Sequence, residues 1–320
     1  MVTPSPPSAT TTCRLCGGPA STVLPGPPRI AACGSCGLAS LVEFPTLEKR
    51  ESAYQEEYYR EGTGDRFLGA FERLVSGFRG LRVRAILRRV PGPGAILDVG
   101  CGRGILLALF RARGWKVLGT QISRTAAEAA RRRYGVEVVV GELPEIPCAE
   151  ERFHVVTFFH VLEHLDRPEA YLRKTWDVLV PGGLLVVEVP NFASPGFRLL
   201  ETRDFCTDYP NHLVFFTPGS LARLLGSCGF RVEEVSHFSL EYSPYTTLQN
   251  ILNFLPGIPG RLYKAMMGNE DGRRLRRSPV TWLHAISGIL LAVPAIVLSL
   301  AGLAAPVGNT MRFYCKKVVK

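Results

Sequence analysis

Four cysteines near the N-terminus occur as two Cys-x-x-Cys pairs, a spacing typical of a metal site. The pairs are Cys13 with Cys16 and Cys33 with Cys36, and a glycine follows each pair. Two such pairs can place four thiolates around one Zn²⁺ ion at roughly 2.3 Å, and glycine tolerates the positive φ that a tight knuckle turn requires. Because four cysteines close the coordination shell, we expect a structural zinc ion. Four unrelated thiols are the alternative.

A glycine-rich loop follows a short apolar run in the middle of the chain. Asp98 lies near the end of the run, and Gly100, Cys101, Gly102 and Gly104 follow it. Glycines let a backbone approach a ligand closely, and a helix that begins after such a loop offers unpaired amides. The spacing departs from the Gly-x-Gly-x-x-Gly pattern of nicotinamide-binding folds. An acid just before the loop suits a cationic ligand, such as an ammonium or a sulfonium, better than a pyrophosphate.

Three histidines are the candidates for proton transfer. His160 and His164 lie one helical turn apart with Glu163 beside them, and His212 lies farther along the chain. Histidine is the natural base near neutral pH. The alternatives are that Glu163 and His164 only cap or orient a helix, and that His212 only binds an acceptor. A catalytic metal held by the three histidines is a further alternative, which no spacing requires.

The segments that must position these residues alternate between strand and helix patterns. Glycine turns and helical patterns separate apolar runs at residues 95–99, 116–119, 136–140, 155–159 and 184–189. Such alternation predicts right-handed crossovers and a parallel sheet that is covered on both faces. Ligands bind at the carboxyl edge of open parallel sheets, where Asp98 and His160 are expected.

Asp98 and the glycines after it resemble the first motif of the class I S-adenosylmethionine-dependent methyltransferases. The resemblance implies that residues 100–102 and Gly104 bind the methionine part of the cofactor. Gln121, followed by Ile122, stands where the family places an acid that holds the ribose hydroxyls. The neutral amide of Gln121 is a departure, and it predicts weaker binding than a carboxylate would give.

The resemblance spans residues 91–240. Glu142 and Leu143 match the loop that meets the adenine, and FHVVTFFHVLEHL at residues 153–165 matches the fourth strand, although His154 replaces the usual acid. The family implies that His160 also contacts the cofactor. We therefore expect an α/β, Rossmann-like, doubly wound and mostly parallel seven-stranded sheet that performs methyl transfer from S-adenosylmethionine.

The flanking segments resemble those of a bacterial methyltransferase subgroup. That subgroup carries an N-terminal zinc knuckle, a tyrosine-rich stretch like residues 54–59 and a segment like PNHLVFFT at residues 210–217. Its members are often associated with methylation of sugars, polysaccharides or lipid-linked small molecules. Tyr54, Tyr58 and Tyr59 are expected either to form a lid over the site or to pack in a helix core.

A long apolar run near the C-terminus has the length of a membrane span. Residues 310–318 resemble the family's last strand, so the chain is expected to return to the sheet, and Pro294 divides the run into two pieces that are too short to cross. We therefore expect a helical hairpin that lies in the membrane plane or re-enters it. Headgroup and interface contacts are expected from Arg273, Arg274, Arg276, Arg277 and Trp282.

Net charge and composition bear on which binding partners are expected. The net charge of +10 raises the question of nucleic acid, but the basic residues are spread along the chain and do not favour it. The N-terminus has neither a basic region nor an apolar one, which predicts a cytoplasmic protein, peripheral or monotopic on the inner face of the cell membrane. A small-molecule, glycan or lipid-linked acceptor is expected. An RNA methyltransferase and a catalytically degenerate membrane scaffold are the alternatives, and a homodimer is left open.

These patterns predict six segments along the chain. They are a disordered tail (1–12), a zinc-ribbon-like knuckle module (13–44), a helical linker or lid (45–90), a methyltransferase domain (91–240), a hydrophobic membrane-interacting insertion (241–307) and the last strand (308–320).

Overall fold

The computed structural model describes residues 10–24, 28–46, 69–148, 150, 152–267 and 270–318. The tyrosine-rich stretch at residues 54–59 lies outside the described residues, as does most of the predicted tail, so the expectations for both stay predictions. Within the predicted linker, the structure places one long helix, α2 (Gly69–Leu87).

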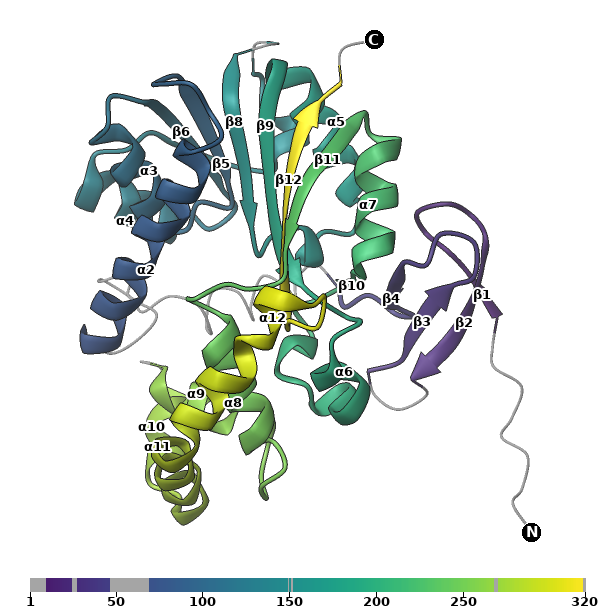
Figure 1. Cartoon of the computed structure of the whole chain (residues 1–320), viewed down its shortest axis with the longest axis vertical. Coiled ribbons are helices and arrows are strands. Elements are labelled where there is room, and N and C mark those ends of the chain that lie inside the picture. The colour runs from purple at the N-terminus through teal and green to yellow at the C-terminus, as the bar shows by residue number, and fades with distance from the viewer. Residues whose placement is uncertain are drawn as a thin grey trace.

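A seven-stranded sheet forms the centre of the molecule, in the order β11-β12-β9-β8-β5-β6-β7 (Figure 1). The strands are β5 (Ala95–Val99), β6 (Lys116–Gln121), β7 (Val138–Val140), β8 (Phe153–Phe159), β9 (Leu179–Pro190), β11 (Phe230–Ser236) and β12 (Thr310–Lys317). Strands β5 to β9 pair in parallel, whereas β12 lies antiparallel to both β9 and β11. The predicted α/β, doubly wound, mostly parallel seven-stranded sheet is confirmed.

Apolar residues on both faces of the central strands hold the helices. Neighbouring residues of one strand enter different cores: Ile96 packs with α2, α3 (Ile105–Arg111) and α4 (Arg124–Tyr134), whereas Leu97 packs with α5 (Pro168–Val178) and α7 (Pro218–Ser227). Side chains alternate across a strand, so an unbroken apolar run is what a sheet covered on both faces requires. All five residues of β5 are buried, as this arrangement demands.

The N-terminal module forms a second sheet with a strand from the main domain. Its order is β1 (Thr10–Thr12), β2 (Pro19–Leu24), β3 (Ile30–Cys33), β4 (Ala39–Leu41) and β10 (Val214–Phe215). The Leu41 amide donates to the Leu213 carbonyl at 2.9 Å, and β4 pairs antiparallel with β10. The module is therefore joined by backbone hydrogen bonds to the segment that carries His212.

A helical layer lies between β11 and β12 in the chain and below the carboxyl edge of the sheet (Figure 1). Its helices are α8 (Ser243–Leu252), α9 (Arg261–Met266), α10 (Glu270–Arg276), α11 (Pro279–Ser299) and α12 (Ala301–Ala304). The predicted hairpin is wrong, because α11 is one continuous helix with Pro294 inside it. A proline removes one backbone hydrogen bond, and the leucines and alanines around it favour helix strongly enough to continue.

Helix α11 turns its small and polar side toward the protein and its apolar side outward. Thr281, His284 and Gly288 are buried, whereas Ile289 is 78% exposed and Val293 is 69% exposed. Among the described residues, Pro279–Ala304 is the one helix long and apolar enough to cross a membrane, with a mean hydropathy of 2.3. This arrangement is the reverse of a soluble surface helix.

Candidate functional site

A cavity of about 270 Å³ opens at the carboxyl edge of the sheet. One side of its lining, the glycine-loop half, includes Asp98, Gly100, Cys101, Gly102 and Gln121. The other side, the histidine half, includes His160, His164, Cys206, Asp208, His212, Tyr242, Tyr245 and Tyr263. The fold therefore brings the predicted loop and all three predicted histidines to one cavity.

The loop conformation explains its glycines. Gly100, Gly102 and Gly104 have φ values of 66°, 54° and 74°, a region that other residues rarely adopt. A Cβ atom on Gly100 would lie 2.6 Å from Cγ2 of Val161, so this position has no room for a side chain. Gly104 precedes α3 as its N-terminal cap residue and does not line the cavity.

Asp98 is a buried carboxylate at the cavity wall. Its Oδ1 accepts a hydrogen bond of 2.6 Å from the Thr157 hydroxyl. Burial raises the pKa of Asp98 to about 6, and the Thr157 hydrogen bond and the charges of Arg79 and Arg82 only partly offset that rise. A carboxylate that is costly to ionise gains most from a cationic ligand, so Asp98 fits the ammonium group that the sequence predicts.

The remaining predicted cofactor residues divide into two groups. Gln121 is 4% exposed and lines the cavity, with its Oε1 accepting from the Ser123 amide at 3.3 Å. Ile122, Glu142 and Leu143 do not line the cavity, and Leu143 is fully buried. Their contacts to the cofactor stay predictions.

His160 lies between two carboxylates. Its Nδ1 is 3.1 Å from Glu163 Oε1, its Nε2 is 3.3 Å from Glu188 Oε1, and its backbone has a positive φ of 57°. Burial by itself lowers the pKa of His160, but Tyr242, Glu163 and Glu188 outweigh it and raise that pKa well above the ordinary value. The position between two carboxylates therefore favours the imidazolium form of His160, in which neither ring nitrogen has a lone pair to accept a proton.

Glu188 joins His160 to a buried network that the motifs did not predict. Arg82 Nη2 donates to Glu188 Oε1 at 2.5 Å and lies 3.3 Å from Glu241 Oε2, and Arg312 also pairs with Glu188. Burial opposes ionisation of Glu188, but Arg312 and Arg82 hold its pKa far below the usual range. An acid inside the otherwise apolar run of β9 is the sequence signal that could have found this network.

His164 and His212 form an edge-to-face pair with ring centroids 4.8 Å apart. The His164 Nδ1 is 2.9 Å from the Asn211 carbonyl, and the His212 Nδ1 is 2.7 Å from the Cys206 carbonyl. A carbonyl only accepts, so each Nδ1 carries the proton and each Nε2 the lone pair. Burial lowers the pKa of His164 to about 4, which keeps it neutral.

Aromatic side chains from the helical layer close the histidine half. Tyr242, Tyr245 and Tyr263 come from residues 241–266, and Phe205 packs edge-on against Tyr263 at 5.1 Å and Tyr245 at 5.8 Å between ring centroids. The helical layer thus contributes a wall of the cavity as well as the exposed face of α11. These tyrosines were not among the predicted site residues, because only the fold brings their segment to the carboxyl edge of the sheet.

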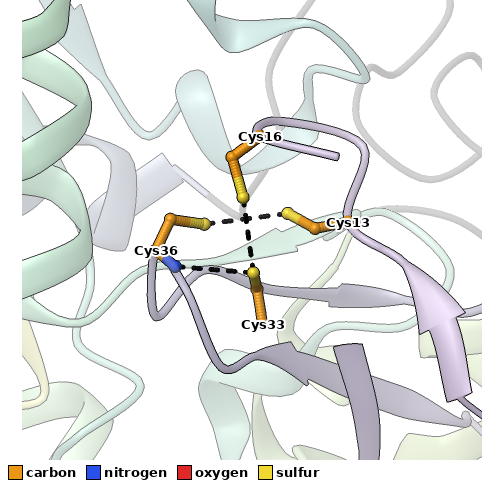
Figure 2. A group of neighbouring side chains, drawn as sticks. All are labelled: Cys13, Cys16, Cys33 and Cys36. Carbon is orange, nitrogen blue, oxygen red and sulfur yellow. Dashed lines mark hydrogen bonds between the residues drawn. The ribbon is translucent and has the colours of Figure 1, made fainter. Parts of the chain in front are cut away.

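The four N-terminal cysteines converge on one point (Figure 2). Cys13 and Cys36 have their Sγ atoms 3.7 Å apart, Cys16 and Cys33 have theirs 3.4 Å apart, and all four lie within 4.8 Å of one another. Ligands roughly 2.3 Å from a tetrahedral ion are separated by about 3.8 Å. The Cys13 and Cys33 carbonyls each accept from the amide of the glycine four residues on, which closes the two knuckle turns.

Comparisons with known proteins agree on one family. Residues 76–235, half of the chain, match the family model described as a methyltransferase domain. A Mycolicibacterium smegmatis protein named as an S-adenosylmethionine-dependent methyltransferase is 32% identical over 43% of this chain and 52% of its own length, so the chain spans about half of that relative. A Pseudomonas fluorescens ubiquinone biosynthesis O-methyltransferase is 31% identical over 52% of this chain and 76% of its own. Among solved structures, an S-adenosylmethionine-dependent methyltransferase from Thermotoga maritima is 27% identical, with a TM-score of 0.42 over 52% of this chain and 78% of that one.

Proposed function

The chain belongs to the methyltransferase-domain family, and we propose that it moves a methyl group from S-adenosylmethionine to a small-molecule, glycan or lipid-linked acceptor at a membrane surface. The observation that carries the proposal is the single cavity in which the glycine loop faces the histidine pair. The Pseudomonas fluorescens relative, named for ubiquinone biosynthesis, supports a small acceptor that partitions to membranes.

The glycine-loop half is the proposed binding site for S-adenosylmethionine, which supplies an electrophilic methyl group on a sulfonium. Asp98 would pair with the ammonium of the methionine part, and the glycine backbone allows the close approach that this contact needs. Gln121 would hold the ribose hydroxyls by neutral hydrogen bonds. Burial of both side chains excludes water, which strengthens each contact.

The histidine half is proposed to bind the acceptor and to assist removal of the acceptor's proton. His164 and His212 hold lone pairs on Nε2, whereas the imidazolium of His160 is suited to donating hydrogen bonds. We therefore assign the proton-accepting role to the His164 and His212 pair, and give His160 a positioning role between Glu163 and Glu188. The tyrosine wall would pack against an amphiphilic acceptor.

Radiolabelled methyl transfer into membrane extracts tests this assignment. His212→Ala is expected to lower transfer about 100-fold or more, because loss of a general base typically costs that much, while S-adenosylmethionine affinity measured by calorimetry stays within about twofold. His237→Ala is the matched control, since His237 does not line the cavity. Undetectable binding of S-adenosylmethionine at millimolar concentration would instead favour a scaffold without activity.

Helix α11 is the proposed membrane contact. The apolar face of α11 is exposed, and α10 comes shortly before α11 in the chain. Arg273 and Arg274 in α10, and Arg277 just after it, are also exposed. Apolar residues enter the headgroup and acyl boundary while arginines bind anionic lipid, so the two features together fit an anionic bilayer surface. Arg276 has a different role from the one predicted, because it donates to the carbonyls of Ala265 and Met267.

Flotation with anionic liposomes tests the contact. Ile289→Glu with Val293→Glu is expected to abolish flotation, whereas Val23→Glu, at an exposed apolar position on β2, leaves it intact. If the unaltered chain is a dimer in lipid-free solution and the double substitution makes it a monomer, the apolar face is a protein interface and the proposal is overturned. Retained flotation of the double variant would also overturn it.

We also propose that Cys13, Cys16, Cys33 and Cys36 hold one structural zinc ion. The convergence of their Sγ atoms and the two glycine knuckle turns support this reading. Four thiolates leave no open coordination position, so the zinc would stabilise the module and take no part in the reaction.

A further inference from the structure

We propose that Glu163, His164 and His212 form a binding site for one divalent first-row transition-metal ion at the wall of the histidine half, where His164 and His212 line the cavity and Glu163 lies behind them. One atom from each side chain that can bind a metal lies within 4.8 Å of the corresponding atoms of the other two. Two imidazoles and one carboxylate bind such ions while leaving further coordination positions open. This site is separate from the four cysteines in position and in ligand chemistry.

The backbone fixes both rings in the tautomer that a metal needs. The Nδ1 atoms of His164 and His212 donate to the carbonyls of Asn211 and Cys206. Histidine ligands in proteins usually donate their second ring N–H to a carbonyl or a carboxylate, which orients the ring and makes the other nitrogen more basic. Both rings therefore have the tautomer in which Nε2 can bind a metal.

Glu163 supplies an independent observation. Its side chain is 1% exposed, and its Oε1 lies 3.1 Å from His160 Nδ1. Its Oε2 is buried and has no hydrogen-bond partner among the described residues. An unsatisfied buried carboxylate oxygen is energetically unfavourable, and a cation between it and the imidazoles would satisfy it.

The surroundings also suit a small cation. A cavity of about 10 Å³, the space of about one water molecule, touches Glu163 and His212 and is otherwise lined largely by apolar and aromatic side chains. His164 does not line it and faces the large cavity. The Asp208 Oδ2 lies 3.9 Å from His212 Nε2 and adds negative charge on the side of the large cavity. Space for one water-sized ion therefore adjoins Glu163 and His212, two of the three proposed ligands.

A metal ion at this point would face the acceptor. With both Nε2 lone pairs bound to the ion, the histidine pair would act on the acceptor through the metal and would not take the proton itself. The ion would coordinate an acceptor hydroxyl and lower the pKa of that hydroxyl, so that the oxygen loses its proton to solvent before methylation. This use of the ion rests on the proposed function and names its acceptor class as hydroxyl-bearing. The binding of the ion does not depend on it.

Cobalt titration of the full chain tests the site. The cysteine cluster is first filled with one equivalent of Zn²⁺, and Co²⁺ is then added while its visible absorption is recorded. We expect one Co²⁺ per chain, with bands typical of nitrogen and oxygen ligands and no thiolate charge-transfer band. Glu163→Gln and His212→Asn are each expected to weaken Co²⁺ binding at least tenfold, whereas His237→Asn, outside the cavity, leaves it unchanged. Circular dichroism confirms that each variant is folded, and either site variant alone suffices.

Two outcomes would overturn the site. One is the absence of Co²⁺ uptake by the zinc-filled chain, and the other is equal affinity in the site variants and the control. Calorimetry with S-adenosylmethionine on the same samples separates this failure from a failure of the proposed function. A chain that binds Co²⁺ at this site but not S-adenosylmethionine would keep the metal site and refute the methyl transfer.

Discussion

The glycine-loop half and the histidine half of the cavity are assembled from different lengths of chain. The first comes mainly from the ends of β5 and β6 and the loop after β5, all within residues 98–121. The second draws on residues 160–164, 205–212, 241–263 and 309–310. A donor common to many reactions can be bound by one local motif, whereas a particular acceptor needs side chains from segments that only this fold brings together.

The largest effect is expected at Glu188, the buried carboxylate behind His160 of the histidine half. Glu188→Gln leaves Arg82, Arg312 and His160 without their shared carboxylate, and the free energy of unfolding should fall by about 3–5 kcal/mol. Urea denaturation measures it. The control Glu234→Gln removes an exposed partner of Arg89 and should cost about 1 kcal/mol or less. Similar losses in both variants would mean that the buried network adds no more stability than an exposed ion pair.

The second effect should be confined to the glycine-loop half. Asp98→Asn removes a charged hydrogen bond to the ammonium of S-adenosylmethionine, and affinity should fall about 10- to 100-fold by calorimetry. Co²⁺ binding in the histidine half should not change. The exposed control Asp166→Asn should alter neither.

The same substitution should stabilise the ligand-free protein at pH 8. The pKa of Asp98 is raised to about 6 in the folded chain, so its contribution to stability is full below pH 4 and is lost as the pH rises through 6. An asparagine escapes that loss. A lower free energy of unfolding for the variant at pH 8 would contradict the buried placement of the carboxylate.

A third effect should fall on the histidine half alone. Cys33→Ser would remove one ligand of the proposed zinc ion, and it should loosen the β4 and β10 pairing and displace His212, which lies two residues before β10. Misplacement of a reacting group by about 1 Å can cost about 100-fold, so we expect a 10- to 100-fold loss of methyl transfer at unchanged S-adenosylmethionine affinity. The control Cys148→Ser lies outside the cluster. If S-adenosylmethionine affinity fell together with methyl transfer, the two halves of the cavity would not respond independently.

The smallest effect is a pH dependence of the glycine-loop half. Below about pH 6 Asp98 gains a proton and loses its attraction for an ammonium, so S-adenosylmethionine affinity should fall about tenfold between pH 7.5 and pH 5. Calorimetry at several pH values measures the profile. Asp98→Asn should give a flat profile, and an equally steep one would assign the titration to another group.

The same division explains how much could be predicted from the sequence. The strands around Asp98 were predictable, because unbroken apolar runs and glycine turns are local signals, whereas the full seven-stranded sheet with its last strand was expected from the family resemblance. The pairing of Arg82 with Glu188 joins residues 106 positions apart, and no local pattern encodes it. The continuity of α11 was mispredicted because Pro294 was given more weight than the helix formers around it.

The antiparallel pairing of β11 with β12 has a consequence for how such proteins can diversify. The helical layer is therefore a long connection between two neighbouring antiparallel strands. The two ends of this connection lie close together, since a Cβ atom on Gly308 would lie 1.7 Å from the His237 carbonyl oxygen. Such a connection can be exchanged for another without altering the strand order. Transplanting the helical layer between related catalytic domains is therefore a direct way to change which acceptors they bind.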